Sequence, residues 1–276
     1  MTMRRRYVDV GDRQVHVGIL GPDPAGTVAR PVVLLHQTPR SIDEFAEVAP
    51  LLAAERTVVA VDLPGMGASD PAAGAVSIEA MAAGVIGAIE GLGIERCDLG
   101  GHHTGGVVAV EVAAARRDLV DRLVLSSTPF VDEAARERRR GRPAIDAVSI
   151  DDDGRFLVEL WERRRPFYPE GRPDLLVRFV RDALRVNDAE AGHRAVSAYE
   201  MERRIPHVVA PTLLVGHARD IYAFGDLTPL HDALQQAGVE VTIATIDDGM
   251  VPLEFTAERF AGAVAEYLDN AEAAHQ

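Results

Sequence analysis

Apolar and polar positions along the chain follow two rhythms, short apolar runs and longer stretches with helical spacing. The continuous runs RPVVLLHQ (30–37) and RTVVAVDLPG (56–65) predict strands that are buried on both faces of a sheet. Further strands are expected over 97–101, 122–127, 210–217 and 239–246, and helices over 77–93, 104–116, 227–237 and 256–270. Because strands and helices alternate, we expect an α/β fold, a twisted and mostly parallel sheet with helices on both faces.

Two local signals refine this pattern near the start of the chain. The runs YVDV (7–10) and QVHVGIL (14–20) flank a Gly-Asp pair and predict an antiparallel hairpin. Ser41 followed by Glu44 has the spacing of a capping box, and Ser77 is expected to cap the helix that follows it.

Residues 132–207 interrupt the alternation of strands and helices. This segment is rich in charge and proline and carries the amphipathic patches RFLVELWERRR and PDLLVRFVRDAL. We therefore expect a helical cap over 132–207, inserted into a core formed by 1–131 and 208–276. Its aromatic residues Trp161 and Tyr199 are expected to line a pocket beneath the cap.

Composition and charge narrow the function classes. The 276 residues are 47% hydrophobic, enough for a sizeable core, and the net charge is −14. Such a charge repels nucleic acid and anionic lipid, so neither is an expected partner. The basic run RERRRGR (136–142) is interpreted as a solvated helix face. The lone Cys97 is expected to be a small buried side chain, and a single cysteine fits a reducing, cytoplasmic compartment. A homodimer is one possible oligomeric state.

Five segments together resemble the α/β-hydrolase family with a helical cap. They are VVLLHQTPRSIDEF, VVAVDLPGMGASD, GGHHTGGVVAVEVAAARRDLVDRLVL, PTLLVGHARD and IDDGMVPLEFTAERFAGAVAEYL, in the order that the family uses. The resemblance implies a nucleophile elbow between a strand and a helix, and a triad of serine, histidine and aspartate for acyl transfer. It also implies that Asp62 holds its loop through hydrogen bonds.

Two of the three triad positions depart from the family pattern. In the elbow GHHTG, the place of the serine nucleophile is taken by His103, between the intact glycines Gly101 and Gly105. The place of the catalytic histidine is taken by Met250, and the family acid is retained as Asp220. Reading Thr104 as the nucleophile would lose the first glycine of the motif, so we disfavour that frame.

We therefore expect a catalytic pair in place of the triad. The imidazole of His103 would act as a general base that Asp220 orients, beside an oxyanion hole formed by the backbone N–H groups of Thr38 and Thr104. Two reactions suit such a site: hydrolysis by an activated water, and proton abstraction beside a carbonyl that leads to elimination, cyclisation or lyase chemistry.

The remaining histidines and cofactors are assigned as follows. His36, Gln37 and His217 are expected to join Met250 in lining the substrate pocket. A metal at these histidines is conceivable, but none is expected, and the chain has no glycine-rich dinucleotide fingerprint, so no cofactor is expected. His16 and His193 are assigned to surface positions, and Asp132 to a helix cap.

The resulting hypothesis is a cofactor-independent enzyme acting on a small carbonyl-containing molecule. The alternative is a non-catalytic protein that binds a small ligand under the same cap. In both cases the partner is a small molecule.

Overall fold

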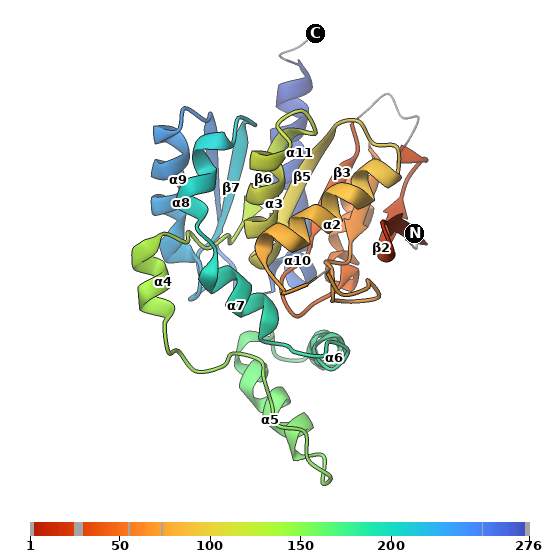
Figure 1. Cartoon of the computed structure of the whole chain (residues 1–276), viewed down its shortest axis with the longest axis vertical. Helices are drawn as coiled ribbons and strands as arrows, with labels where there is room; N and C mark the ends of the chain where they lie inside the picture. Colours follow the sequence, from red (N-terminus) through yellow and green to blue (C-terminus); the bar gives the residue numbers. More distant parts are fainter. Residues whose placement is uncertain (1–2, 25–29, 55, 73, 250, 274–276) are drawn as a thin grey trace.

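The computed structural model describes residues 3–24, 30–54, 56–72, 74–249 and 251–273. Within these residues, eight strands form one sheet in the order β1-β2-β4-β3-β5-β6-β7-β8 (Figure 1). The strands are β1 (Arg4–Val10), β2 (Arg13–Leu20), β3 (Val32–Leu35), β4 (Val58–Val61), β5 (Cys97–His102), β6 (Val120–Ser126), β7 (Thr212–His217) and β8 (Val241–Ile246). The hairpin of β1 and β2 and the pair of β2 with β4 are antiparallel, and the pairs from β4 to β8 are parallel. The fold expected from the sequence is confirmed.

Helices cover both faces of the sheet. In the core they are η2 (Ile42–Phe45), α1 (Val48–Leu52), α2 (Ile78–Gly91), α3 (Thr104–Ala115), η5 (Phe224–Asp226), α9 (Leu227–Gln236), α10 (Pro252–Phe255) and α11 (Ala257–Ala273). Val33 and Leu35 of β3 pack with α2 and α3, whereas Val32 and Leu34 pack with α1 and α11. This alternation explains why the strand sequence is apolar at every position.

A second group of helices lies between β6 and β7. They are α4 (Glu133–Arg139), α5 (Arg155–Arg164), η3 (Arg165–Phe167), α6 (Pro173–Ala183), α7 (Ala191–Ala198), α8 (Met201–Arg204) and η4 (Ile205–His207). Figure 1 shows α5 and α6 beyond one end of the sheet. Helix α7 lies against the loop after β3. A Cβ on Gly192 of α7 would stand only 2.2 Å from Oγ1 of Thr38 in that loop. The role of 132–207 as a separate cap stays a prediction.

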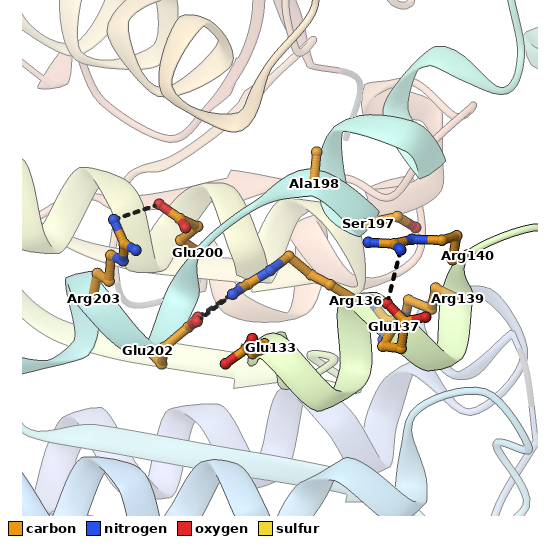
Figure 2. A pocket seen from close by; sticks show the side chains of 10 residues that line it. All are labelled: Glu133, Arg136, Glu137, Arg139, Arg140, Ser197, Ala198, Glu200, Glu202 and Arg203. Carbon is orange, nitrogen blue, oxygen red and sulfur yellow. Dashed lines mark hydrogen bonds and ion pairs between the residues drawn. The ribbon is translucent and has the colours of Figure 1, made fainter.

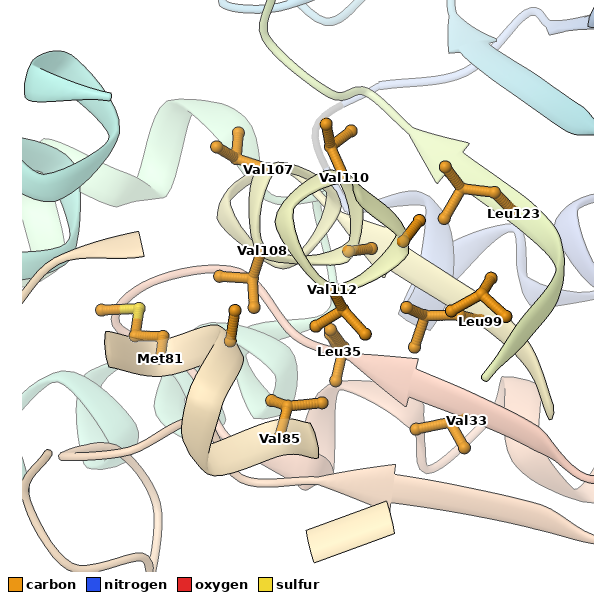
Figure 3. Packing of buried hydrophobic residues seen from close by; sticks show 14 of the residues in the cluster. Val33, Leu35, Met81, Val85, Leu99, Val107, Val108, Val110, Val112 and Leu123 are labelled. Carbon is orange, nitrogen blue, oxygen red and sulfur yellow. The ribbon is translucent and has the colours of Figure 1, made fainter. Parts of the chain in front are cut away.

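Helix α3 is the centre of the main core. Its valines are fully buried between α2 and the strands β3, β5 and β6, as Figure 3 shows for Val107, Val108, Val110 and Val112. Since α3 begins directly after β5, its depth in the core fixes the position of the turn between them.

The two glycines of this turn permit the close approach. A Cβ on Gly105 would stand 2.0 Å from the carbonyl oxygen of Leu35, and one on Gly101 would stand 2.2 Å from the carbonyl oxygen of Gly105. Both obstacles are backbone atoms, which cannot rotate away.

Gly105→Ala should therefore destabilise the fold by about 1–3 kcal/mol or more, because β3 and α3 must separate. Gly262→Ala, on α11, is the matched control, since a Cβ there meets no atom within 4 Å. The control should stabilise the protein by roughly 0.5–1 kcal/mol through helix propensity. Urea unfolding of both variants tests this, and equal stabilities would contradict the packing of the elbow described here.

The local signals of the sequence are confirmed in part. Ser77 accepts from the N–H of Ala80 at 3.1 Å, and Asp132 accepts from the N–H of Ala135 at 2.7 Å. The expected capping box is wrong: Ser41 accepts from Asp43 N–H, while the carboxylate of Glu44 turns away to Gln37 and Arg40. Cys97 is fully buried, as expected. Among the described helices, none is both long and apolar enough to cross a bilayer.

Candidate active site

The turn between β5 and α3 holds His103 in a strained backbone conformation. Its φ of 46° and ψ of −114° lie outside the regions that L-residues favour. A conformation of this kind costs about 1–3 kcal/mol and persists only where the surroundings enforce it. The N–H of His103 donates to the carbonyl of Ser126 at 3.0 Å, and its carbonyl accepts from Gly106 N–H at 2.9 Å, so neighbouring elements hold the turn.

The ring of His103 faces the carboxylate of Asp220. Nε2 of His103 lies 2.9 Å from Oδ2 of Asp220, which is an ion-pair distance, although the contact lacks hydrogen-bond geometry. The other oxygen, Oδ1, accepts from the N–H groups of Tyr222 and Ala223 at 2.9 and 3.2 Å. Catalytic hydrogen bonds are often poorly aligned in ligand-free sites and tighten when substrate binds.

These contacts favour the ionised form of Asp220. Burial alone would raise the pKa of this carboxyl group, but the adjacent His103 ring and the N–H of Tyr222 hold it well below its usual range. The carboxylate is therefore available to orient the imidazole.

A cavity of about 450 Å³ opens beside this pair. His103 lines it together with three residues expected at the site, Gln37, Thr38 and Thr104. Thr104 is the first residue of α3, so its backbone N–H has no acceptor within the helix. The opposite wall comes from the segment between β6 and β7, and this part of the lining comprises Arg139, Gly141, Arg142, Pro143, Ala144, Ile145, Arg164, Glu190, His193, Arg194, Val196 and Ser197.

Four residues expected in the pocket lie elsewhere in the described structure. His36 is fully buried, and both its ring nitrogens have partners: Nδ1 donates to the carbonyl of Gln37, and Nε2 accepts from Leu63 N–H. His217 is also fully buried, and the hydroxyl of Tyr199 donates to Glu111 inside the core. Trp161 packs in a small apolar cluster between α5 and α6. Met250, the fifth pocket residue that the sequence predicts, lies outside the described residues.

Two histidines assigned to the surface are instead engaged in the structure. Nδ1 of His16 lies 2.7 Å from Oδ2 of Asp62, and both residues are buried. Asp62 also accepts from the N–H groups of Ile42 and Ala68 at 2.7 and 2.8 Å, so it holds its loop as expected. His193 lines the cavity.

A hydrogen-bonded chain that was not predicted from the sequence runs from His102, in the elbow, to Asp248. Nδ1 of His102 lies 3.0 Å from Oγ of Ser126, and that oxygen lies 2.9 Å from Nε2 of His217. Nδ1 of His217 in turn lies 2.7 Å from Oδ1 of Asp248, whose other oxygen accepts from the hydroxyl of Thr256. All but Thr256 are buried. The acidic pair in IDDG was the available signal for Asp248.

A carboxylate at Asp248 and a neutral ring at His217 would give this chain one consistent set of hydrogen-bond directions. Asp248 would accept from Nδ1–H of His217, and Nε2 of His217 would accept from the Ser126 hydroxyl. Ser126 Oγ would then accept from Nδ1–H of His102. Burial lowers the pKa of His102 well below its usual value, and the nearby His103 lowers it further. His102 is therefore neutral, and its ring packs edge-on to that of His103 with centroids 4.5 Å apart.

A group with metal-ligating geometry occurs among the described residues and includes two residues of the cavity lining, Glu190 and His193. Asp146, Glu190 and His193 have donor atoms within 4.8 Å of one another. Asp146 is already paired with Arg164, whose Nε lies 2.6 Å from Oδ1 and whose Nη2 contacts Oδ2, and Nε2 of His193 lies 2.8 Å from Oδ2 of Asp146. Glu190 accepts from two backbone N–H groups, those of Asp146 and Ala147. The donor set is thus used within the protein.

Comparison with known proteins identifies the family. The family described as alpha/beta hydrolase fold matches residues 30–204, which is more than half of the chain. The chain belongs to the α/β-hydrolase family. A fluoroacetate dehalogenase from Burkholderia sp is 40% identical over 121 residues, which is 42% of this chain and 38% of that protein. A soluble epoxide hydrolase from Corynebacterium sp. (strain C12) is 40% identical over 95 residues, 34% of this chain and 33% of the relative.

The matched regions therefore span well under half the length of these hydrolases. Solved α/β-hydrolase structures extend the likeness to nearly the whole fold. The enol-lactonase from Burkholderia xenovorans LB400 superposes with a TM-score of 0.74 over 96% of this chain and 100% of that one, at 21% identity. At this identity the likeness establishes the fold alone.

Proposed function

We propose that this α/β-hydrolase hydrolyses a small carbonyl-containing molecule without a cofactor, with His103 as general base. The observation that carries the proposal is the 2.9 Å approach of Asp220 to the ring of His103, at a cavity that also contains Thr38 and Thr104. In this family the elbow normally presents a nucleophile beside an oxyanion hole. Here the same position presents a base.

In this proposal the two ring nitrogens of His103 have different roles. With Nε2 held against Asp220, the hydrogen on Nε2 serves orientation, and Nδ1 carries the lone pair that accepts a proton. Nδ1 would take a proton from water while the hydroxide oxygen attacks the carbonyl carbon. The backbone N–H groups of Thr38 and Thr104 would stabilise the oxyanion, and the imidazolium would return the proton to the leaving oxygen.

The same base could instead abstract a proton beside the carbonyl, and this remains the second reaction open to the site. Product analysis separates the two reactions: hydrolysis in ¹⁸O-labelled water places the label in the carboxylate formed, whereas elimination or cyclisation adds no oxygen.

A conventional nucleophile is the main competing mechanism. Ser126, His217 and Asp248 have the hydrogen-bond order of a serine triad, with 2.9 and 2.7 Å links. However, Ser126 is 1% exposed and is absent from the lining of the cavity beside His103. Its hydroxyl is instead hydrogen-bonded to the buried rings of His102 and His217.

The proposal predicts a hydrolysis that does not depend on a serine. Wild-type protein should hydrolyse at least one member of a panel of p-nitrophenyl esters and γ-lactones, and treatment with a fluorophosphonate should leave that rate unchanged. Ser126→Ala should retain turnover within about fivefold, because its role is to support the elbow and not to attack the substrate. Circular dichroism checks that the variant is folded.

Phosphonate inactivation, or loss of turnover in Ser126→Ala at retained fold, would assign the chemistry to Ser126. A protein that binds the panel compounds and turns none over would support the alternative of a non-catalytic binding protein, for which the replacement of the family histidine by Met250 is the motivating observation.

A further inference from the structure

The wall of the cavity opposite His103 carries an excess of arginine. Four arginines line it, Arg139, Arg142, Arg164 and Arg194, against the single carboxylate of Glu190. The whole chain has a net charge of −14, so this wall is opposite in sign to the average surface. The arrangement favours an anion in a cavity whose other side carries the candidate base.

Two of these arginines are already satisfied by carboxylates. Arg164 is held by both oxygens of Asp146, and its guanidinium stacks over the ring of Phe179 at 4.9 Å. Arg194 pairs with Asp188 outside the cavity wall. Their charges are largely balanced, and we assign them to holding the wall together.

Arg139 and Arg142 are much less completely paired. Nη2 of Arg139 has one long contact, 3.5 Å, to Oδ2 of Asp226. Nε of Arg142 donates to the carbonyl of Arg138, and no carboxylate among the described residues lies within ion-pair distance of Arg142. Burial lowers the pKa of Arg139, and the positive charges of Arg142 and Arg138 lower it further. An anion placed between the two guanidinium groups would relieve this repulsion.

The backbone explains how a basic run reaches the cavity. Helix α4 ends at Arg139, and Gly141 turns the chain with a φ of +74°. The residues after this turn, from Arg142 to Ile145, then line the cavity. Two arginines of the basic run 136–142 therefore line the cavity, and Arg142 is also exposed to solvent, as expected for this run.

A neighbouring groove shows what a balanced surface looks like in the same region. Figure 2 shows this groove, lined by four arginines and four glutamates, with pairs between Arg136 and Glu202, Arg140 and Glu137, and Arg203 and Glu200. Arg139 lines this groove as well as the cavity at His103, and it has no pair with the glutamates of the groove; its one carboxylate contact among the described residues is to Asp226.

We propose that Arg139 and Arg142 bind a carboxylate group of the substrate, so that the preferred substrate is a small ester or lactone that carries a free carboxylate. This inference rests on the proposed function, because it assumes that the bound molecule is hydrolysed. The binding of the carboxylate itself does not require turnover. Guanidinium groups are suited to this role because they donate two parallel hydrogen bonds to a carboxylate.

The test compares two matched probes by isothermal titration calorimetry, 4-phenylbutyrate and 4-phenylbutan-1-ol, which differ in the carboxylate. Wild-type protein should bind the carboxylate about tenfold more tightly or better, as expected for hydrogen bonds to a charged group. Arg139→Gln and Arg142→Gln should each lose most of this preference. Arg138→Gln is the control, because Arg138 lies in the same run and outside the cavity wall, and only its backbone carbonyl contacts Arg142.

Equal binding of the two probes, binding of neither probe at 10 mM, or an equal loss in Arg138→Gln would overturn the proposal. The last outcome would mean that the arginines act only through their long-range field. Failure of the proposed hydrolysis is a separate result: His103→Ala should retain the carboxylate preference, whether or not wild-type protein turns over any ester.

Discussion

Replacing His103 with alanine should lower kcat by about 10²- to 10⁴-fold on the best ester of the panel, the range attributable to a positioned general base. The fold should be retained, because removal of the imidazole takes away no hydrogen bond in the chain that begins at His102. Thermal stability should fall slightly, because the buried carboxylate of Asp220 loses the ring that favours its ionised form. Steady-state kinetics and thermal unfolding measure the two effects separately.

His193→Ala is the matched control, since His193 also lines the cavity but lies on α7 and contacts Asp146. It should change KM more than kcat. Asp220→Asn should give an intermediate loss of kcat, because the amide still fills the space but no longer stabilises an imidazolium. If His103→Ala and His193→Ala have the same kcat as wild type, a general base at the elbow is excluded.

The fold could be predicted because it depends on local pattern. The runs around Val33 and Val59 are apolar at every position, and such runs occur where strands are covered on both faces. The elbow could also be predicted, from the glycines at 101 and 105. Any other residue at these positions would place its Cβ within 2.2 Å of a backbone atom. Placing His103 near Asp220 needed the family resemblance, since 117 residues separate them in the chain.

The rest of the site arises from contacts between distant loops, which no local pattern encodes. His217 was expected to line the pocket, yet it points into the core because Asp248 and Ser126 offer partners to both its ring nitrogens. His16 was assigned to the surface, yet β2 is covered by neighbours and Asp62 is within 2.7 Å. In each case the hydrogen-bond partner of the histidine lies at the end of a different strand. Burial of the polar ring becomes favourable only when the ring and this partner meet in the fold.

The same limit applies to Arg40, whose role no sequence pattern indicated. Arg40 is 0% exposed and donates to Glu254 through Nη1 at 3.1 Å and Nη2 at 2.8 Å. Nε donates to Asp182 of α6 at 3.2 Å, and Nη1 lies 3.5 Å from Glu44. The residue therefore connects the loop after β3, helix α10 and the helical segment between β6 and β7. Burial tends to raise the pKa of Glu254, and Arg40 opposes this shift.

Arg40→Met should consequently be the most destabilising substitution considered in this protein. It removes this cation from the buried carboxylates of Asp182 and Glu44 and leaves Glu254 with Arg178, and removal of one partner of a buried pair costs about 3–5 kcal/mol. At the size of this chain, that loss lowers Tm by on the order of 10 °C. Arg172→Met is the control: Arg172 pairs with Asp174 at the exposed surface, and its loss should leave Tm unchanged.

The pH dependence of this deficit gives a sharper test than its size. Burial already raises the folded-state pKa of Glu254, and without Arg40 this pKa should rise further, because the largest opposing charge is removed. A group with a raised folded pKa is bound to its proton more tightly in the folded state, so the variant regains stability as the pH falls through that pKa. Calorimetry at pH 5 and pH 8 should show the smaller difference from wild type at pH 5. A deficit of the same size at pH 5 and pH 8 would contradict this account, because it would mean that Arg40 stabilises the fold by packing alone and that its carboxylate partners contribute nothing.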